Sequence, residues 1–290
     1  MKLTAHDICT ATGGTLVQGS AETIFTAVTI DSRTASAGAL FVPLPGTNTD
    51  GHAFLATAVQ QGAAGFFFAE HLNPTLPQGA VAIRVADPLT ALQSLATWAR
   101  TRSAARIIGI AGSNGKTTTK ELMAQVFASQ KKTWATPGNL NNHIGLPLTL
   151  LRAEADVEVM VLELGTSGAG ELAALCQIAH PQIGVITSIA EEHTETLKDL
   201  AGVIAAETEI IAALPADGIA VVYGDHEGLL EAVHRQARCR IVTFGEHANN
   251  QFRLSEIQVT RQGTRCLLHT PQGALTLQLQ LLGSHFALAA

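Results

Sequence analysis

The chain has 290 residues, 47% hydrophobic and 14% charged, a globular balance that suits about two domains. Its net charge of −6, with no Lys or Arg run longer than Lys131-Lys132, argues against a nucleic-acid partner. The sequence contains no uninterrupted apolar stretch of about 18 residues, so no membrane span is predicted, and its polar first residues are unlike a secretory leader. Four cysteines without a CxxC pair indicate reduced thiols, so we expect a cytoplasmic protein.

The first hundred residues alternate short apolar runs with segments of helical spacing, which is typical of a small α/β domain. Strands are predicted at 25–30, 39–42, 65–68 and 81–85, and helices at 52–62 and 89–100. Pro88 suits the first turn of the second helix. Residues 103–105 read as a linker, so we place a first domain at 1–103.

The next segment predicts a parallel α/β sheet. Short β-branched runs at 106–111, 157–164 and 183–189 suit strands buried on both faces, with crossover helices at 117–130, 170–179 and 199–213. Antiparallel strands follow at 251–260, 264–270 and 274–282, separated by Gln-Gly turns. The predicted fold class is therefore α/β: a small α/β N-terminal domain, then a P-loop ATPase-like domain at 104–282. The second has a mainly parallel sheet and a small antiparallel β extension.

The strongest local signal is the Gly-rich turn between an apolar strand and a helix at 107–120. Its glycines let successive N–H groups point at phosphate oxygens, and the helix N-terminus adds positive charge. Lys116 would reach the β- and γ-phosphates, and the Thr117 hydroxyl would ligate Mg²⁺. The alternative is an ordinary turn with a solvated lysine. We predict that ATP and Mg²⁺ bind here, at Gly112, Ser113, Asn114, Gly115, Lys116, Thr117 and Thr118.

Two motifs carry a resemblance to one family. Residues 112–117 match the G-[ST]-x-G-K-[ST] loop of the Mur ligases, and residues 138–151 resemble the signature of their MurF type. Asparagines supply donors and acceptors without charge, which suits a peptide or phosphate-bearing substrate. The alternative is a polar loop that caps a helix beginning near Ile144. The predicted substrate-binding residues here are Asn139, Asn141, Asn142 and His143.

The resemblance also implies metal ligands. Glu163, at the end of an apolar strand, matches the ligand of the Mg²⁺ that bridges the nucleotide phosphates, and His193 matches a ligand of a second Mg²⁺. The alternative for Glu163 is a glutamate that accepts a hydrogen bond from a neighbouring helix N-terminus. The alternative for His193 is a surface histidine beside carboxylates. With Lys116, these two form the expected catalytic set. Glu207 stands where MurF-like ligases carry a carbamylated lysine; we hypothesise that it replaces that ligand, the alternative being loss of the second metal.

The amino-terminal segment follows the motif order that MurE and MurF types share in the domain holding the UDP-sugar. The matching runs are 31–33, 38–46 and 50–54. The resemblance implies that Ser32 and Arg33 lie by the uridine diphosphate, where Arg33 could bond phosphate. Pro45 departs from the lysine common in the family, and Asp50 could equally be a helix N-cap.

The resemblance implies a cytoplasmic, monomeric ligase of peptidoglycan precursor synthesis. It would use ATP to join D-alanyl-D-alanine to UDP-N-acetylmuramoyl-tripeptide through an acyl phosphate. Residues 283–290 resemble the lead into a third domain, and we expect that domain to be missing. Two alternatives stay open. One is a non-catalytic or truncated nucleotide-binding protein derived from a ligase, and the other is a MurE-type or folylpolyglutamate-type ligase.

Overall fold

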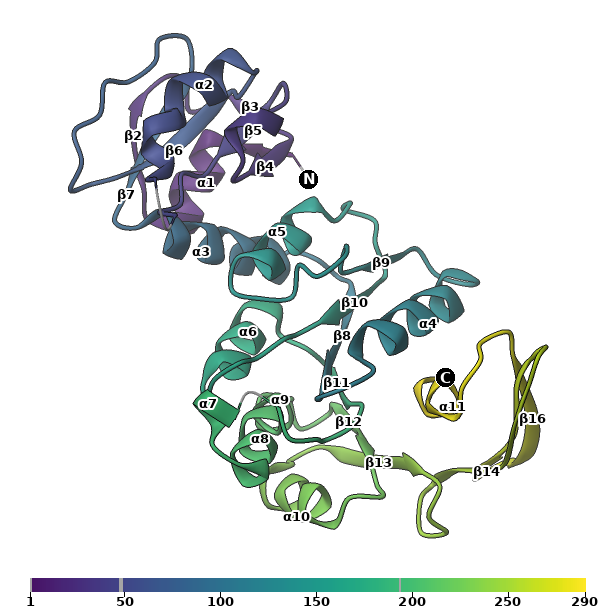
Figure 1. Cartoon of the computed structure of the whole chain (residues 1–290). Helices are drawn as coiled ribbons and strands as arrows, with labels where there is room; N and C mark the ends of the chain where they lie inside the picture. The colour runs from purple at the N-terminus through teal and green to yellow at the C-terminus, as the bar shows by residue number, and fades with distance from the viewer. Residues whose placement is uncertain (1, 47–48, 193) are drawn as a thin grey trace. The chain divides into compact units, whose positions relative to one another are not determined.

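The computed structural model describes residues 2–46, 49–192 and 194–290 (Figure 1). They form two compact units. The first holds the residues up to Ser103 together with His143–Ala155, and the second holds Ala104–Asn142 and Asp156–Ala290. Within the described residues, no helix is both long enough and apolar enough to cross a membrane.

The first unit is built on a five-stranded sheet in the order β2-β7-β6-β5-β4. Four strands are parallel and β2 joins antiparallel. The strands are β2 Thr15–Gln18, β4 Ala27–Thr29, β5 Ala39–Phe41, β6 Gly65–Ala69 and β7 Val81–Val85, with a separate antiparallel pair β1 Leu3–Thr4 and β3 Ile24–Phe25. The helical segments are α1 Ala5–Thr12, η1 Ser32–Thr34, η2 Gly51–Phe54, α2 Leu55–Gln60, α3 Pro88–Thr101 and α5 Gly145–Arg152.

The core of this unit lies on both faces of β6, all of whose residues are buried. Phe66 and Phe68 share an apolar cluster with Leu55 of α2. Phe67 points to the opposite face by strand alternation, where α3 contacts β6. α3 begins where the sequence predicts, because the Asp87 side chain accepts the Thr90 N–H at 2.8 Å.

Two predictions for this unit are wrong in detail. The strand expected at 25–30 is interrupted at Thr26, whose N–H donates to Gly38 O, so β3 and β4 are separate. The helix expected at 52–62 opens as a 3₁₀ turn at Gly51–Phe54, with Asp50 as its N-cap. The strands predicted at 39–42, 65–68 and 81–85 are confirmed.

The second unit carries a nine-stranded sheet in the order β16-β15-β14-β13-β12-β11-β8-β10-β9. Pairing is parallel from β9 to the start of β14 and antiparallel from β14 to β16, which confirms the predicted fold class. The strands are β8 Arg106–Ala111, β9 Thr133–Ala135, β10 Val159–Glu163, β11 Ile183–Ile186, β12 Ile219–Tyr223, β13 Arg240–Gly245, β14 Phe252–Thr260, β15 Gly263–Thr270 and β16 Gly273–Leu279. The helices are α4 Lys116–Ala128, α6 Glu171–Ala179, α7 Thr194–Leu197, α8 Leu200–Glu207, α9 Glu209–Ala212, α10 Glu227–Gln236 and α11 Ser284–Ala289.

Helices cover both faces of this sheet: α4 and α11 lie on one side, and α6, α8, α9 and α10 on the other (Figure 1). On the α4 side, Ile108, Ile110 and Val161 form an apolar cluster with Met123 of α4. On the other side, a Cβ at Gly109 would stand 3.0 Å from Ile210 Cδ1, so glycine permits the close approach of α9. The parallel strands are therefore buried on both faces, as their sequence predicts.

The single helix predicted at 199–213 is wrong. It is divided into α8 and α9 at Thr208, whose hydroxyl donates to Ile204 O at 2.7 Å and accepts the Gln236 Nε2–H at 2.9 Å. A threonine hydroxyl that bonds a carbonyl four residues back competes with the helical ladder and often bends it. The break separates Glu207 from Glu209.

Candidate nucleotide and substrate sites

The Gly-rich turn links the carboxyl end of β8 to the start of α4. Gly112 and Gly115 have φ values of 115° and 85°, in the left-handed region that favours glycine. A Cβ at Gly112 would also stand 2.5 Å from Thr187 Oγ1. Lys116 Nζ turns back onto the loop and donates to Gly112 O and, at 3.0 Å, to Ser113 O. The loop's lysine is therefore held by the loop's own carbonyls.

The segment after β11 holds the middle of this loop. The Ser113 N–H donates to Ser188 O at 2.9 Å, and the Asn114 N–H donates to Ser188 Oγ at 3.0 Å. Ser113 Oγ exchanges hydrogen bonds with the main chain of Ala190, at 2.9 Å and 3.1 Å. Ser188 and Ala190 thus both contact the loop.

Glu207 holds the first residue of the loop. Its carboxylate is 2% exposed and accepts the Gly112 N–H at 2.6 Å. Burial raises the pKa of Glu207 to about 7, partly offset by the charge of Lys116 and by the Gly112 hydrogen bond. Since the N–H groups of residues 112–114 are bonded to protein acceptors, the main-chain donors that remain for an anion at this loop are those at the start of α4. The first four N–H groups of a helix lack intrahelical acceptors.

Thr117 and Glu163 come together from neighbouring elements. Thr117 Oγ1 donates to Glu163 Oε2 at 2.9 Å, and Asn141 Nδ2 donates to Glu163 Oε1 at 2.8 Å. The Glu163 N–H donates to Thr136 Oγ1 at 2.9 Å. Glu163 is 3% exposed, so its carboxylate is fixed in place by partners on both oxygens.

This pair fits Mg²⁺ shared with a nucleotide. A hydroxyl and a carboxylate are hard oxygen ligands, and Mg²⁺ is commonly bound by one or two carboxylates plus phosphates and waters. Within the part of the chain that the structure describes, no group of three or more His, Cys, Asp or Glu side chains is placed to hold a metal. His193, the ligand predicted for a second metal, lies outside the described residues.

A pocket of about 400 Å³ adjoins the loop within the second unit. The loop contributes Asn114 and Gly115 to its lining, and the C-terminal segment contributes His285 and Phe286. The His285 and Phe286 rings lie 4.2 Å apart, centroid to centroid. These two rings and the first turn of α4 line the same pocket, an arrangement that suits a nucleotide's base and ribose.

The asparagine cluster is divided between different environments. Asn141 bonds Glu163, and its own N–H donates to Asn139 O at 2.8 Å. Asn139, Asn142 and His143 are exposed. His143 belongs to the first unit, where its carbonyl accepts from Gln93 Nε2 at 3.0 Å. A helix begins directly afterwards at Gly145, as expected.

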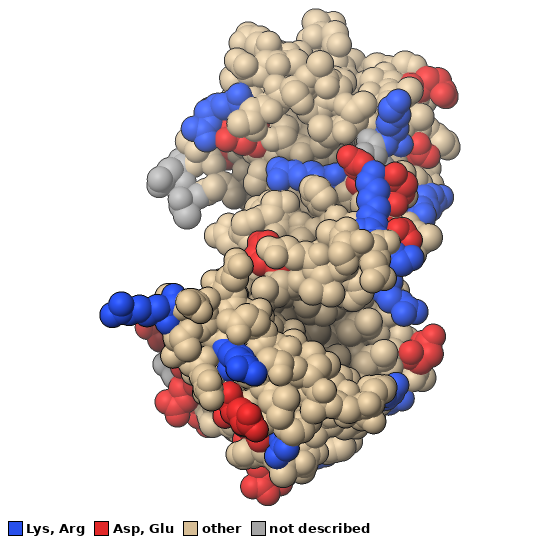
Figure 2. All heavy atoms as spheres, turned by 90° about the vertical axis from the view of Figure 1, so that its right-hand side faces the viewer, with Lys and Arg blue, Asp and Glu red and all other residues tan. Residues whose placement is uncertain are grey.

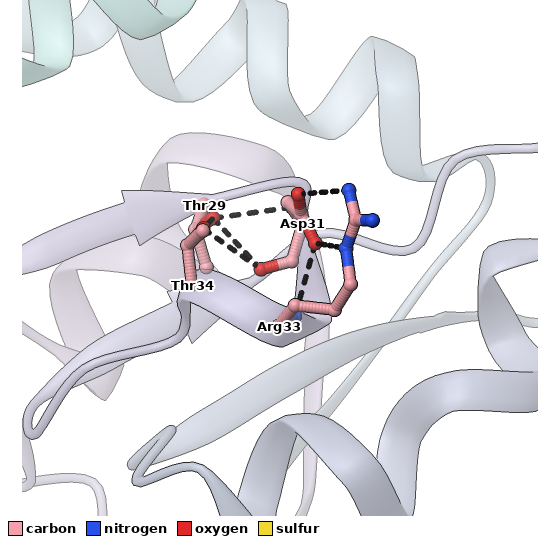
Figure 3. A network of polar contacts seen from close by, with 4 residues as sticks. All are labelled: Thr29, Asp31, Arg33 and Thr34. Atoms are coloured by element: carbon pink, nitrogen blue, oxygen red, sulfur yellow. Dashed lines mark hydrogen bonds and ion pairs between the residues drawn. The ribbon is translucent and has the colours of Figure 1, made fainter.

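In the first unit, Ser32 and Arg33 line an open pocket of about 600 Å³. Arg33 forms a bidentate pair with Asp31, at 2.9 Å from Nε and 2.8 Å from Nη2 (Figure 3). These hydrogen bonds lower the pKa of Asp31 to about 2. Ser32 is buried, whereas the Arg33 side chain is 83% exposed. An exposed guanidinium at a pocket is available to an anion, although Asp31 competes for it.

Charged side chains of both signs are interspersed on the face drawn in Figure 2, over a surface made mostly of other residues.

Two buried polar residues of the second unit that support the Thr117–Glu163 pair were not predicted from the sequence: Lys120 and Thr136 are 0% and 2% exposed. The one available signal was a lysine on the apolar side of a predicted helix.

Comparison with known proteins identifies the family. The Mur ligase middle domain matches residues 110–290, and the catalytic domain model of the Mur ligase family matches residues 24–99. The chain belongs to the Mur ligase family. This Mur ligase chain is 36% identical over 286 residues to the UDP-N-acetylmuramoyl-tripeptide–D-alanyl-D-alanine ligase of Bacillus subtilis, covering 98% of the chain and 61% of that protein. The corresponding Escherichia coli ligase is 36% identical over 260 residues, covering 89% and 57%.

Solved structures of MurF ligases superpose on this chain over nearly its whole length. MurF from Acinetobacter baumannii superposes with a TM-score of 0.91 at 29% identity, over 100% of this chain and 63% of that one. MurF from Thermotoga maritima in complex with ADP gives 0.82 at 26% identity, over 91% and 60%. This Mur ligase chain therefore spans about three fifths of the length of the relatives and structures it matches.

Proposed function

We propose that this chain is the sugar-nucleotide- and ATP-binding part of a MurF-type ligase, acting as a cytoplasmic monomer. The reaction joins D-alanyl-D-alanine to UDP-N-acetylmuramoyl-tripeptide at the expense of ATP. One observation carries the proposal: the Thr117–Glu163 pair stands at the end of a phosphate-binding loop, and Asn141 of the MurF-like signature bonds the same carboxylate. A nucleotide site and a substrate motif thus meet at one side chain.

Residues 1–103 are assigned to the UDP-muramoyl-peptide, with Ser32 and Arg33 beside the diphosphate. Residues 104–282 are assigned to ATP, and residues 283–290 lead toward the part of the relatives that the chain does not span. The names of the relatives support this substrate assignment.

A carboxylate cannot be attacked directly by an amine, because its leaving group would be oxide. In the first step a substrate carboxylate oxygen attacks the γ-phosphorus and the bond to the β–γ bridging oxygen breaks, which releases ADP. In the second step the amine of D-alanyl-D-alanine attacks the acyl carbon and loses a proton to solvent, and phosphate leaves with the former carboxylate oxygen.

The chain's residues act on the first step through charge and position. Lys116 would exchange its loop carbonyls for the β- and γ-phosphate oxygens, and the N–H groups at the start of α4 would face the same phosphates. Thr117 and Glu163 would hold Mg²⁺, which neutralises phosphate charge when bound. Glu207, and His193 by resemblance, are the candidate ligands for a second ion.

A non-catalytic nucleotide-binding protein is the second candidate. Its specific support is Glu207, which replaces a lysine of the resemblance motif and is already bonded to Gly112 N–H. Hydroxylamine converts an acyl phosphate into a stable hydroxamate and therefore separates the two. The ligase proposal predicts hydroxamate that depends on both ATP and UDP-N-acetylmuramoyl-tripeptide. Tight binding of both ligands without hydroxamate would support the non-catalytic candidate.

A further inference from the structure

Lys120 is a fully buried lysine on α4, one turn after Thr117. Burying an ammonium group is costly unless its donors are satisfied. Lys120 Nζ donates to Thr136 O at 2.9 Å and lies 2.9 Å from Glu121 Oε1. A third acceptor, Gly138 O, stands at 3.5 Å. Three acceptors therefore surround the three N–H donors.

Thr136 connects this lysine to Glu163. The Thr136 N–H donates to Val161 O at 3.1 Å, and its hydroxyl accepts the Glu163 N–H at 2.9 Å. Its carbonyl is the one that accepts from Lys120. A single buried residue thus joins the lysine to the main chain of Glu163.

Gly138, whose carbonyl oxygen is the most distant of the three acceptors around Lys120, is the first residue of the segment that contains the asparagines. Its φ of 54° turns the chain, and the Leu140 N–H donates to Pro137 O at 3.2 Å. Asn141 follows and bonds Glu163 Oε1. Lys120 therefore holds the backbone before Asn141 as well as the residue that supports Glu163.

We propose that Lys120 and Thr136 are positioning residues that fix the Glu163 carboxylate opposite the Thr117 hydroxyl. Residues three apart on a helix share a face, so α4 presents Thr117 and Lys120 on the same side. The helix thereby supplies one candidate ligand directly and orients the other through Thr136. The role in Mg²⁺ binding rests on the proposed function, whereas the positioning itself does not.

Paired variants test each link. Thr136→Val removes the hydroxyl at nearly constant volume, and Thr136→Ser keeps it. Lys120→Met removes the three donors, and Lys120→Arg keeps the charge. Thr149→Val is the matched control, because Thr149 is also fully buried with its hydroxyl bonded to a main-chain carbonyl, Gly145 O at 2.9 Å.

Two readouts are made on each variant. The first is amide hydrogen exchange of segments 136–142 and 161–165. We expect about tenfold faster exchange at the Glu163 amide in Thr136→Val and throughout 136–142 in Lys120→Met. The second is the Mg²⁺ concentration that half-saturates binding of a non-hydrolysable ATP analogue. It should rise about tenfold in both variants, while affinity for the Mg²⁺-free analogue stays within about twofold.

The controls and the outcomes separate the claims. Thr136→Ser should restore both readouts, and Thr149→Val should change neither. Unchanged exchange at Glu163 in Thr136→Val would overturn the positioning role, whether or not any nucleotide binds. If exchange changes but the wild-type chain binds no Mg²⁺-nucleotide, the proposed function fails while the positioning stands. Equal loss of Mg²⁺-free and Mg²⁺-bound affinity would mean that Lys120 only stabilises the fold.

Discussion

The Thr117 hydroxyl donates to the Glu163 carboxylate at 2.9 Å across 46 residues of sequence. Thr117 lies at the start of α4, the helix that follows β8, and Glu163 is the last residue of β10. The strands β8 and β10 are adjacent and parallel. Around β8 the strand order changes direction, with β10 and β9 on one side and β11, β12 and β13 on the other. Open α/β sheets bind ligands at the carboxyl ends of strands at such a point. The position of the pair in the topology therefore agrees with its proposed role.

Glu163→Gln should weaken Mg²⁺-dependent nucleotide binding selectively. The amide keeps the hydrogen bond from Thr117 but loses the charge that attracts the ion, so we expect about a hundredfold loss with Mg²⁺. Calorimetric titration of an ATP analogue with and without Mg²⁺ measures this. Glu158→Gln, which removes an exposed carboxylate paired with Lys131, serves as the control. Equal affinities for Glu163→Gln and wild type in Mg²⁺ would contradict the ligand assignment.

Lys116→Met should lower nucleotide affinity even without Mg²⁺. Loss of charge-assisted hydrogen bonds to phosphate is expected to weaken binding about 10- to 100-fold. The same titration in EDTA measures it, and Lys131→Met is the control, because Lys131 is an exposed lysine paired with Glu158. Undiminished affinity in Lys116→Met would mean that the lysine stays on the loop carbonyls when a nucleotide binds.

Glu207→Gln should make the metal-free chain less sensitive to pH. The pKa of Glu207 is raised from its ordinary value of 4.5 to about 7 by burial, so the folded state keeps a proton that the unfolded state releases. The contribution of protonated Glu207 to the free energy of unfolding is fully present below pH 4.5. It is lost as the pH rises toward 7, which lowers the free energy of unfolding by up to about 3 kcal/mol. We expect the Tm of the wild type to fall relative to that of Glu207→Gln between pH 4.5 and 7.5 in EDTA.

Glutamine can still accept the Gly112 N–H, so the variant tests charge and leaves the loop contact possible. Parallel Tm–pH curves for the two proteins would show that Glu207 stays ionised throughout. If Glu207 also ligates a second ion, Mg²⁺ should raise the Tm of the wild type more than that of the variant at pH 7.5.

Arg33→Met should weaken binding of UDP about tenfold without changing Tm. The guanidinium is exposed at the pocket of the first unit and offers charge-assisted hydrogen bonds to a diphosphate. Asp31→Asn should preserve or strengthen UDP binding, since it removes the competing carboxylate. Arg84→Met, at an exposed position of β7, is the control. Weaker UDP binding in Asp31→Asn would show that Asp31 orients Arg33 and does not compete with the ligand.

Much of the fold could be predicted from the sequence because it rests on local patterns. The strands β8, β10 and β11 are short apolar runs, and Gly112 and Gly115 mark a turn that needs left-handed backbone. The missed helix α1 carried a signal as well, a capping box in which Thr4 and Asp7 bond each other's main chain. The two-residue spacing of Glu207 and Glu209 gave no sign of the break between them.

The support of the candidate site could not be predicted, because it depends on partners distant in sequence. Lys120 reaches Thr136 across 16 residues, and the Glu163 N–H reaches the Thr136 side chain across 27. The position of Lys120 on the apolar side of its helix could indicate burial but not its partner, and a threonine is ordinary in the segment of Thr136. The same holds for Glu207, whose partner Gly112 lies 95 residues away, so a pattern could suggest a metal ligand but not the loop contact.

Titration of UDP-N-acetylmuramoyl-tripeptide into the chain, with a non-hydrolysable ATP analogue and Mg²⁺ present, tests the central claim most directly. UDP-N-acetylglucosamine serves as the comparison ligand, since it keeps the uridine diphosphate and lacks the peptide. Saturable binding at one site, tighter for the muramoyl tripeptide than for UDP-N-acetylglucosamine, is the result we predict. Saturable binding of the nucleotide analogue without any binding of the tripeptide ligand would contradict the proposed substrate.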